Sequence, residues 1–198
     1  MSGLYALVLA AGLGSRFGGR KLLSPWRGGV LLDGALSVAL DSPTEAVWLV
    51  TGADGAEVAA AAQKLAQARH QAKRLRILAA PDYADGLSAS LRAGLAALPD
   101  ETSGVLVFLG DMPVVPPDLA AQLAHALAGG ALAAAPICNG QRGNPVALSS
   151  ALFAQLAQLS GDKGARSVLD GLGARLALIP TENDGVLIDV DRPGDTPA

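Results

Sequence analysis

Short apolar runs and longer segments with helical spacing alternate along the chain. Most of the runs are continuously apolar rather than alternating in polarity, which is typical of strands covered on both faces. The runs predict strands at residues 4–11, 46–51, 76–80, 104–109, 131–136, 145–148, 175–179 and 185–189. Helical spacing or strong helix formers predict helices at residues 33–40, 55–70, 87–98, 117–128, 150–159 and 165–172.

The steady order of strand, helix and strand predicts the fold class. Right-handed crossovers would place the strands in a mostly parallel central sheet between helical layers, which is an α/β architecture. No linker, long charge run or internal repeat divides the 198 residues, so we expect a single domain over residues 1–198. In such sheets ligands collect beyond the carboxyl ends of the strands, so the residues that follow each strand are the candidates for chemistry.

Composition and charge narrow the class of partner. The formal net charge of −3 gives no broad field for nucleic acid or an anionic membrane, so an anion site would have to be local. One cysteine, Cys138, and two distant histidines, His70 and His125, offer neither a zinc pattern nor a Cys–His pair. No segment reaches the ~20 apolar residues of a membrane span, and no Lys or Arg precedes the first apolar run as in a signal peptide. We expect a cytoplasmic protein that binds neither nucleic acid nor membrane.

The first apolar run continues into a loop rich in glycine and positive charge, LVLAAGLGSRFGGRKLL at residues 7–23. The dinucleotide pattern G-x-G-x-x-G fails because Phe17 takes the place of the third glycine. The P-loop pattern fails because Arg20 and Lys21 follow a glycine where Lys and then Ser or Thr are required. The glycines still allow backbone N–H groups to form an anion nest, and Arg16 and Lys21 can bind phosphate. A solvated turn with incidental cations is the alternative.

Several motifs occur in a fixed order along nearly the whole chain. They are LAAG at 9–12, SRFG at 15–18, KLL at 21–23, PW at 25–26, VTG at 50–52, PDYADGLSASLRAG at 81–94, GDMP at 110–113, RGNPV at 142–146 and DVDRPGD at 189–195. Together they resemble the signature of the MobA-like nucleotidyltransferase family, and of its cytidylyltransferase branch in particular. The resemblance implies a three-layer α/β/α sandwich, similar to a Rossmann fold. It also implies transfer of CMP from CTP to the terminal phosphate of molybdopterin, with Mg²⁺ as the metal and pyrophosphate as the leaving group.

The implied reaction brings two anions together, so the protein must neutralise and align them. That chemistry requires cations on the triphosphate and a magnesium ion held by carboxylates. Arg16 and Lys21 are the candidate phosphate ligands, and Asp111, at the carboxyl end of a central apolar run, is the candidate metal ligand. These three residues form the predicted catalytic set. Strand alternation would turn Asp189 and Asp191 to one face, and either of them could complete the metal site.

The resemblance assigns nucleotide binding to two segments. The expected nucleotide-binding residues are Leu9, Ala10, Ala11, Gly12, Gly14 and Ser15 after the first strand, and Pro81, Asp82, Gly86 and Ser88 later in the chain. Relatives that use GTP tend to carry a second glycine where Ala11 stands, so Ala11 favours CTP over GTP. For Asp82, a hydrogen bond to the nucleotide and the capping of a turn are equally open.

The same resemblance assigns acceptor binding to Arg142, Gly143, Asn144 and Pro145. A histidine usually stands at the Asn144 position in the molybdenum branch, so the acceptor is the point at which this chain departs from the pattern. A molybdoenzyme or its chaperone is the implied protein partner. The alternatives are a guanylyltransferase, a transferase for a different phosphorylated acceptor, and a cofactor-delivery protein without catalysis.

Overall fold

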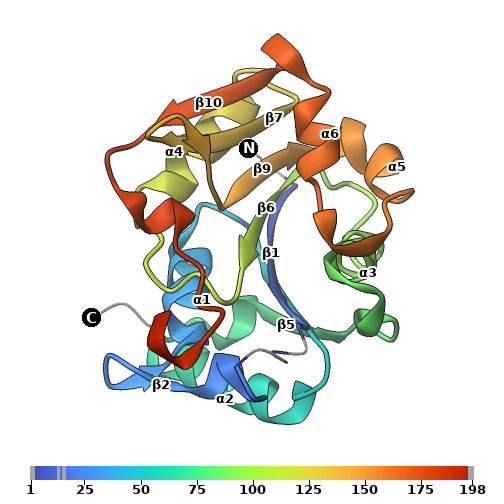
Figure 1. Cartoon of the computed structure of the whole chain (residues 1–198). Coiled ribbons are helices and arrows are strands. Elements are labelled where there is room, and N and C mark those ends of the chain that lie inside the picture. Colours follow the sequence, from blue (N-terminus) through green and yellow to red (C-terminus); the bar gives the residue numbers. More distant parts are fainter. Residues whose placement is uncertain (1–2, 13, 15–16, 196–198) are drawn as a thin grey trace.

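The centre of the fold is a mixed sheet whose strand order is β10-β7-β9-β6-β1-β4-β5, with β8 paired to β7 (Figure 1). This computed structural model describes residues 3–12, 14 and 17–195. Its strands are β1 (Leu4–Ala10), β4 (Val47–Thr51), β5 (Leu75–Ala79), β6 (Gly104–Leu109), β7 (Ala133–Cys138), β8 (Gln141–Arg142), β9 (Val146–Ser149) and β10 (Leu176–Pro180). A separate antiparallel ladder joins β2 (Pro25–Trp26) to β3 (Gly29–Val30).

One strand of the main sheet, β9, is antiparallel to its neighbours. The ladders β6–β1–β4–β5 and β10–β7 are parallel, whereas β9 pairs antiparallel with both β6 and β7. The chain reverses after β7 through Asn139, which adopts a positive φ of 50°, and β8 then pairs back onto β7. The carboxyl ends of β1, β4, β5 and β6 therefore meet at one edge of the sheet.

Helices cover both faces of this sheet. They are α1 (Leu32–Asp41), α2 (Gly55–Ala68), α3 (Leu87–Ala96), α4 (Leu119–Ala128), α5 (Phe153–Leu156) and α6 (Arg166–Asp170). Side chains of α1, α2 and α4 form one core cluster with Ala6 and Val8 of β1, and those of α3, α5 and α6 form the other with Leu7 and Leu9. Alternate side chains of β1 thus pack into two cores, one on each face of the sheet. The predicted three-layer α/β/α architecture is confirmed.

Short 3₁₀ segments complete the described structure. They are η1 (Lys21–Leu23), η2 (Ala72–Arg74), η3 (Tyr83–Asp85), η4 (Ser150–Leu152), η5 (Gly161–Lys163), η6 (Gly173–Arg175), η7 (Asp184–Leu187) and η8 (Pro193–Asp195). In the described ranges, no helix is long and apolar enough to cross a bilayer.

The predicted strand at 185–189 is wrong. The side-chain oxygen Oδ1 of Asn183 accepts a hydrogen bond from the N–H of Gly185 at 2.9 Å, and this turn starts η7 instead of a strand. A Cβ at Gly185 would lie 2.2 Å from the carbonyl oxygen of Val114, so the backbone packs onto another loop rather than onto a strand. The helix expected at 150–159 is also divided, into η4 and the single turn α5. The other predicted strands and helices are present, with ends that differ by a few residues.

Candidate active site

Lys21 and Asp111 meet at the carboxyl ends of the central strands. Lys21 begins η1, and its Nζ donates a hydrogen bond to Asp111 Oδ2 at 2.7 Å. The same ammonium group lies 3.5 Å from Asp191 Oδ1. Its side chain is only 12% exposed, against 26% for Asp111 and 44% for Asp191. A largely buried cation therefore joins the first loop to two carboxylates from distant parts of the chain.

The loop after β6 holds Asp111 through backbone contacts. Gly110 donates its N–H to the carbonyl of Leu9 at 2.9 Å, which ties the ends of β6 and β1 together. The carbonyl of Asp111 accepts a hydrogen bond from the N–H of Val190 at 3.0 Å. That bond brings the segment from Asp189 to Asp191 beside Asp111.

The side chains of Asp189 and Asp191 do not share a strand face, because no strand forms at this position. Asp191 approaches Lys21, whereas Asp189 lines the neighbouring cavity. Partial burial raises the pKa of Asp189 above its ordinary value, and the charges of Asp111 and Asp191 raise it further. The site is thus a concentration of negative charge that Lys21 offsets only in part.

This donor set fits a divalent cation held together with a bound polyphosphate. In the described part of the chain no three His, Cys, Asp or Glu side chains converge as a ready metal site. Mg²⁺, however, is usually held by one or two carboxylates plus water and substrate phosphates. Asp111 and Asp191 already contact a single cation, the ammonium group of Lys21, so both carboxylates reach one common position.

The first loop is only partly described. Leu9 lines the cavity, and Ala10 and Ala11 are buried at 5% and 3% exposure. A Cβ at Gly52 would lie 2.3 Å from the carbonyl of Ala11, so the glycine of the VTG motif allows this close approach of two loops.

Two glycines of the first loop lie beside these residues. Gly12 is exposed, and the carbonyl of Gly14 accepts hydrogen bonds from Phe17 and Gly19. Ser15 and Arg16, the second predicted phosphate ligand, lie outside the described residues.

The second predicted nucleotide segment is divided between two places. Pro81 and Asp82 are exposed and line a separate hollow between β5 and α3. Gly86 has a φ of +100° and packs on η5, where a Cβ would lie 2.3 Å from Asp162 Oδ1. Ser88 is fully buried in the first turn of α3, and its Oγ has no hydrogen-bond partner in the described structure.

A cavity of about 640 Å³ adjoins the charged cluster. Its walls combine apolar side chains from the sheet and from α3 with polar side chains from the acceptor motif and from α6. The lining residues are Leu9, Leu87, Leu91, Val107, Leu109, Asp111, Met112, Gln141, Arg142, Gly143, Asn144, Val146, Asp162, Gly164, Ala165, Arg166, Leu169, Val186, Leu187 and Asp189. A flat organic group could lie against the apolar side while a phosphate lay beside Asp111.

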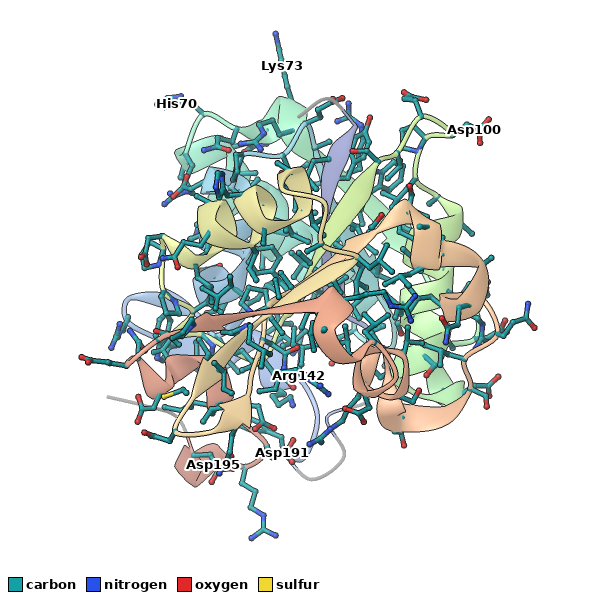
Figure 2. All side chains as sticks on the ribbon, turned by 90° about the horizontal axis from the view of Figure 1, so that it is seen from above. His70, Lys73, Asp100, Arg142, Asp191 and Asp195 are labelled. Atoms are coloured by element: carbon teal, nitrogen blue, oxygen red, sulfur yellow. The ribbon has the colours of Figure 1, made fainter. Side chains whose placement is uncertain are left out.

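The predicted acceptor motif forms one wall of this cavity. Gly143 donates to the carbonyl of Pro136 and Asn144 to that of Val186, each at 2.9 Å. A Cβ at Gly143 would lie 2.2 Å from the carbonyl of Val186, so only glycine allows this contact. The Asn144–Pro145 peptide bond is cis, and Pro145 is buried and is not among the lining residues. Figure 2 shows Arg142 and Asp191 toward the same side of the molecule, away from His70, Lys73 and Asp100.

Sequence reasoning missed the wall formed by η5 and α6. Asp162 accepts a hydrogen bond from the N–H of Leu87 at 3.3 Å and lines the cavity with Arg166. Asp170, at the end of α6, pairs with Arg142 at 2.5 Å. The polar stretch between Gly161 and Arg166, with its two glycines, was the available signal, but only the fold brings it to the acceptor motif.

Comparison with known proteins shows the family of this chain. The family model described as the MobA-like NTP transferase domain matches residues 6–177. The chain belongs to this family. Molybdenum cofactor cytidylyltransferase of Escherichia coli K12 is 30% identical over 195 residues, which cover 98% of this chain and 94% of that enzyme. Nicotine blue oxidoreductase of Paenarthrobacter nicotinovorans is also 30% identical, over 93% of this chain and 90% of that protein.

Solved structures share the fold. The crystal structure of Rv0371c from Mycobacterium tuberculosis superposes with a TM-score of 0.82 at 25% identity, over 97% of this chain and 94% of that one. A structure of the same mycobacterial protein in complex with manganese gives a TM-score of 0.78 at 24% identity, over 98% and 96% of the two chains. This MobA-like chain is therefore an enzyme of nucleotidyltransferase type, as its motifs imply.

Proposed function

We propose that this protein is a Mg²⁺-dependent cytidylyltransferase that moves CMP from CTP to the terminal phosphate of molybdopterin, or of its molybdenum-bound form, and releases pyrophosphate. The observation that carries the proposal is the contact of Lys21 with Asp111 beside a cavity lined by residues of the acceptor motif. Identity of 30% to the Escherichia coli cytidylyltransferase over almost the whole chain supports the substrate pair.

The chain's own residues divide the work of bringing two anions together. Lys21, together with Arg16, would neutralise the triphosphate and the charge that develops on departing pyrophosphate. Asp111, with Asp191, would hold the divalent ion, and Asp189 is the alternative second carboxylate. When bound, that ion supplies positive charge to the phosphates of both substrates.

The two substrates would meet at the charged cluster. The nucleotide base would lie along the loop from Leu9 to Gly14, where Ala11 favours CTP. The acceptor would lie in the cavity, where Arg142 and Asn144 provide hydrogen-bonding groups and the leucine side chains exclude water. A molybdoenzyme or its chaperone would receive the product.

A second candidate follows from the other relative. Nicotine blue oxidoreductase matches this chain at the same 30% identity, so a redox reaction in the cavity is the main alternative. The first loop lacks the G-x-G-x-x-G pattern of dinucleotide binding, which favours nucleotidyl transfer.

The test is pyrophosphate release by the purified protein with Mg²⁺, a molybdopterin acceptor, and CTP or GTP. We expect release with CTP, dependent on both acceptor and metal, and little with GTP. Release with GTP alone would make the protein a guanylyltransferase. No release with either nucleotide would overturn the proposal. A transferase for a different phosphorylated acceptor, a delivery protein without catalysis and a redox reaction would then be the remaining candidates.

A further inference from the structure

We infer that Asp170 is a positioning residue. It holds the guanidinium of Arg142 in an orientation in which Arg142 donates hydrogen bonds to an uncharged edge of the acceptor's ring system. The inference rests on the proposed function, since it concerns how the proposed acceptor is recognised. It assigns a role to α6, an element that none of the family motifs in this sequence includes.

The pair is built from two elements that form the same cavity wall. Arg142 lies in β8 and Asp170 ends α6, and Arg142 Nη2 donates to Asp170 Oδ1 at 2.5 Å. The side chain of Arg142 is 21% exposed and lines the cavity, whereas that of Asp170 is 60% exposed and does not. Asp170 therefore holds Arg142 from the solvent side.

Stability alone does not explain this pair. An ion pair with one partner this exposed contributes little to folding. Fixing the guanidinium has a larger effect on binding, because Arg presents five N–H donors in a rigid fork and Asp170 occupies only part of it. The remaining donors belong to a side chain that lines the cavity, next to Asn144 and Gln141.

The charges around Arg142 indicate which part of the acceptor it binds. Asp170 compensates the positive charge of Arg142, and the described cavity lining holds Asp111, Asp162 and Asp189 against Arg142 and Arg166. A second anionic group on the acceptor would find little net attraction on this wall. A carbonyl oxygen beside a ring nitrogen, as on an oxopterin, matches the fork of an arginine as the edge of guanine does. Leu87, Leu91 and Leu169 offer apolar surface for the flat ring.

The test uses steady-state kinetics of the whole protein with CTP and the molybdopterin acceptor. Asp170→Ala should raise the KM for the acceptor at least about tenfold, with the KM for CTP and kcat within about twofold of wild type. Asp170→Asn keeps an oxygen acceptor for Arg142 and should recover part of the loss. A simple oxopterin without phosphate should compete with the acceptor, and Asp170→Ala should weaken that competition by a similar factor.

The matched control is Asp41→Ala, which removes a similar half-exposed partner from Arg69 elsewhere on the surface. It should leave every kinetic constant unchanged. An unchanged acceptor KM in Asp170→Ala would overturn the inference, as would equal competition by oxopterin in both proteins or an equal loss in Asp41→Ala. Wild-type protein that releases no pyrophosphate would overturn the proposed function instead, so the two failures are distinguishable.

Discussion

Lys21 donates a hydrogen bond to Asp111 across 90 residues of sequence, at 2.7 Å, and this contact organises the charged cluster. Asp191 lies 3.5 Å from the same ammonium group. Lys21 thus occupies the position that the two carboxylates would offer to a divalent cation. A triphosphate would compete for Lys21, which links nucleotide binding to metal binding.

Removal of Lys21 should therefore strengthen metal binding to the nucleotide-free protein. We expect Lys21→Met to bind Mn²⁺ about tenfold more tightly, since a cation a few Å away repels another by ~1–4 kcal/mol at the dielectric of a protein surface. Electron paramagnetic resonance of Mn²⁺ titrations measures the affinity directly. Lys64→Met removes the same charge from an exposed position on α2 and should change nothing. Equal affinity in Lys21→Met and wild type would contradict the competition.

Asp111→Asn should reduce CMP transfer by at least roughly 10²-fold while CTP still binds, because the carboxylate acts on transition-state charge rather than on the base. Quenched-flow analysis gives the transfer rate, and fluorescence titration gives the affinity for CTP. Asp100→Asn, which lies far from Asp191 in Figure 2, is the control and should behave as wild type. Full activity in Asp111→Asn would remove Asp111 from the mechanism.

Gly34→Ala tests the packing that holds the loop of Asp111. A Cβ at Gly34 would lie 2.1 Å from the carbonyl oxygen of Pro113, so α1 or the loop must move. We expect a loss of about 1–3 kcal/mol in the free energy of unfolding, measured by urea denaturation, and slower transfer. Gly129→Ala places a methyl group at the end of α4 with its nearest neighbour at 3.4 Å, and it should be neutral or slightly stabilising. Unchanged stability in Gly34→Ala would contradict the close packing.

Glu45 should make folding stability depend on pH. The backbone N–H of Gly3 and the hydroxyl of Tyr5 donate to its carboxylate, and these bonds lower the pKa of Glu45 below its ordinary value. A lowered pKa in the folded state adds stability above the ordinary Glu value of 4.5, and this stability is lost as the pH falls through the folded pKa.

Glu45→Gln should therefore unfold at lower urea concentration than wild type at neutral pH, and the difference should narrow in acid. Denaturation curves at several pH values measure it. Glu182→Gln, at an exposed position, should match wild type throughout. A difference in stability between Glu45→Gln and wild type that stays constant with pH would show that the lowered pKa of Glu45 is not its cause.

The sequence predicts the layered fold well because its signals are local. Continuous apolar runs such as 104–109 have few alternatives to a buried strand, and β6 has these bounds. The run at 185–189 looked similar, but Asn183 and the contact of Gly185 with Val114 turn it into a 3₁₀ segment. The antiparallel direction of β9 depends on the reversal after β7, which periodicity alone does not encode.

The site residues likewise divide into those that the sequence predicts and those that only the fold reveals. Lys21 and Asp111 were predicted from motifs, with Asp189 and Asp191 as alternatives for a second carboxylate. The fold brings Lys21, Asp111 and Asp191 together. Asp162, Arg166 and Asp170 were not predicted, because their relation to the cavity exists only after α6 packs beside the acceptor motif.

Position-specific isotope labelling tests the central claim of nucleotidyl transfer most directly. The protein is mixed with Mg²⁺, the molybdopterin acceptor, and CTP labelled with ³²P at either the α- or the γ-phosphate. We predict that the α label appears in the acceptor and the γ label in pyrophosphate. An unlabelled acceptor in both reactions, or an acceptor labelled from the γ-phosphate, would contradict the account.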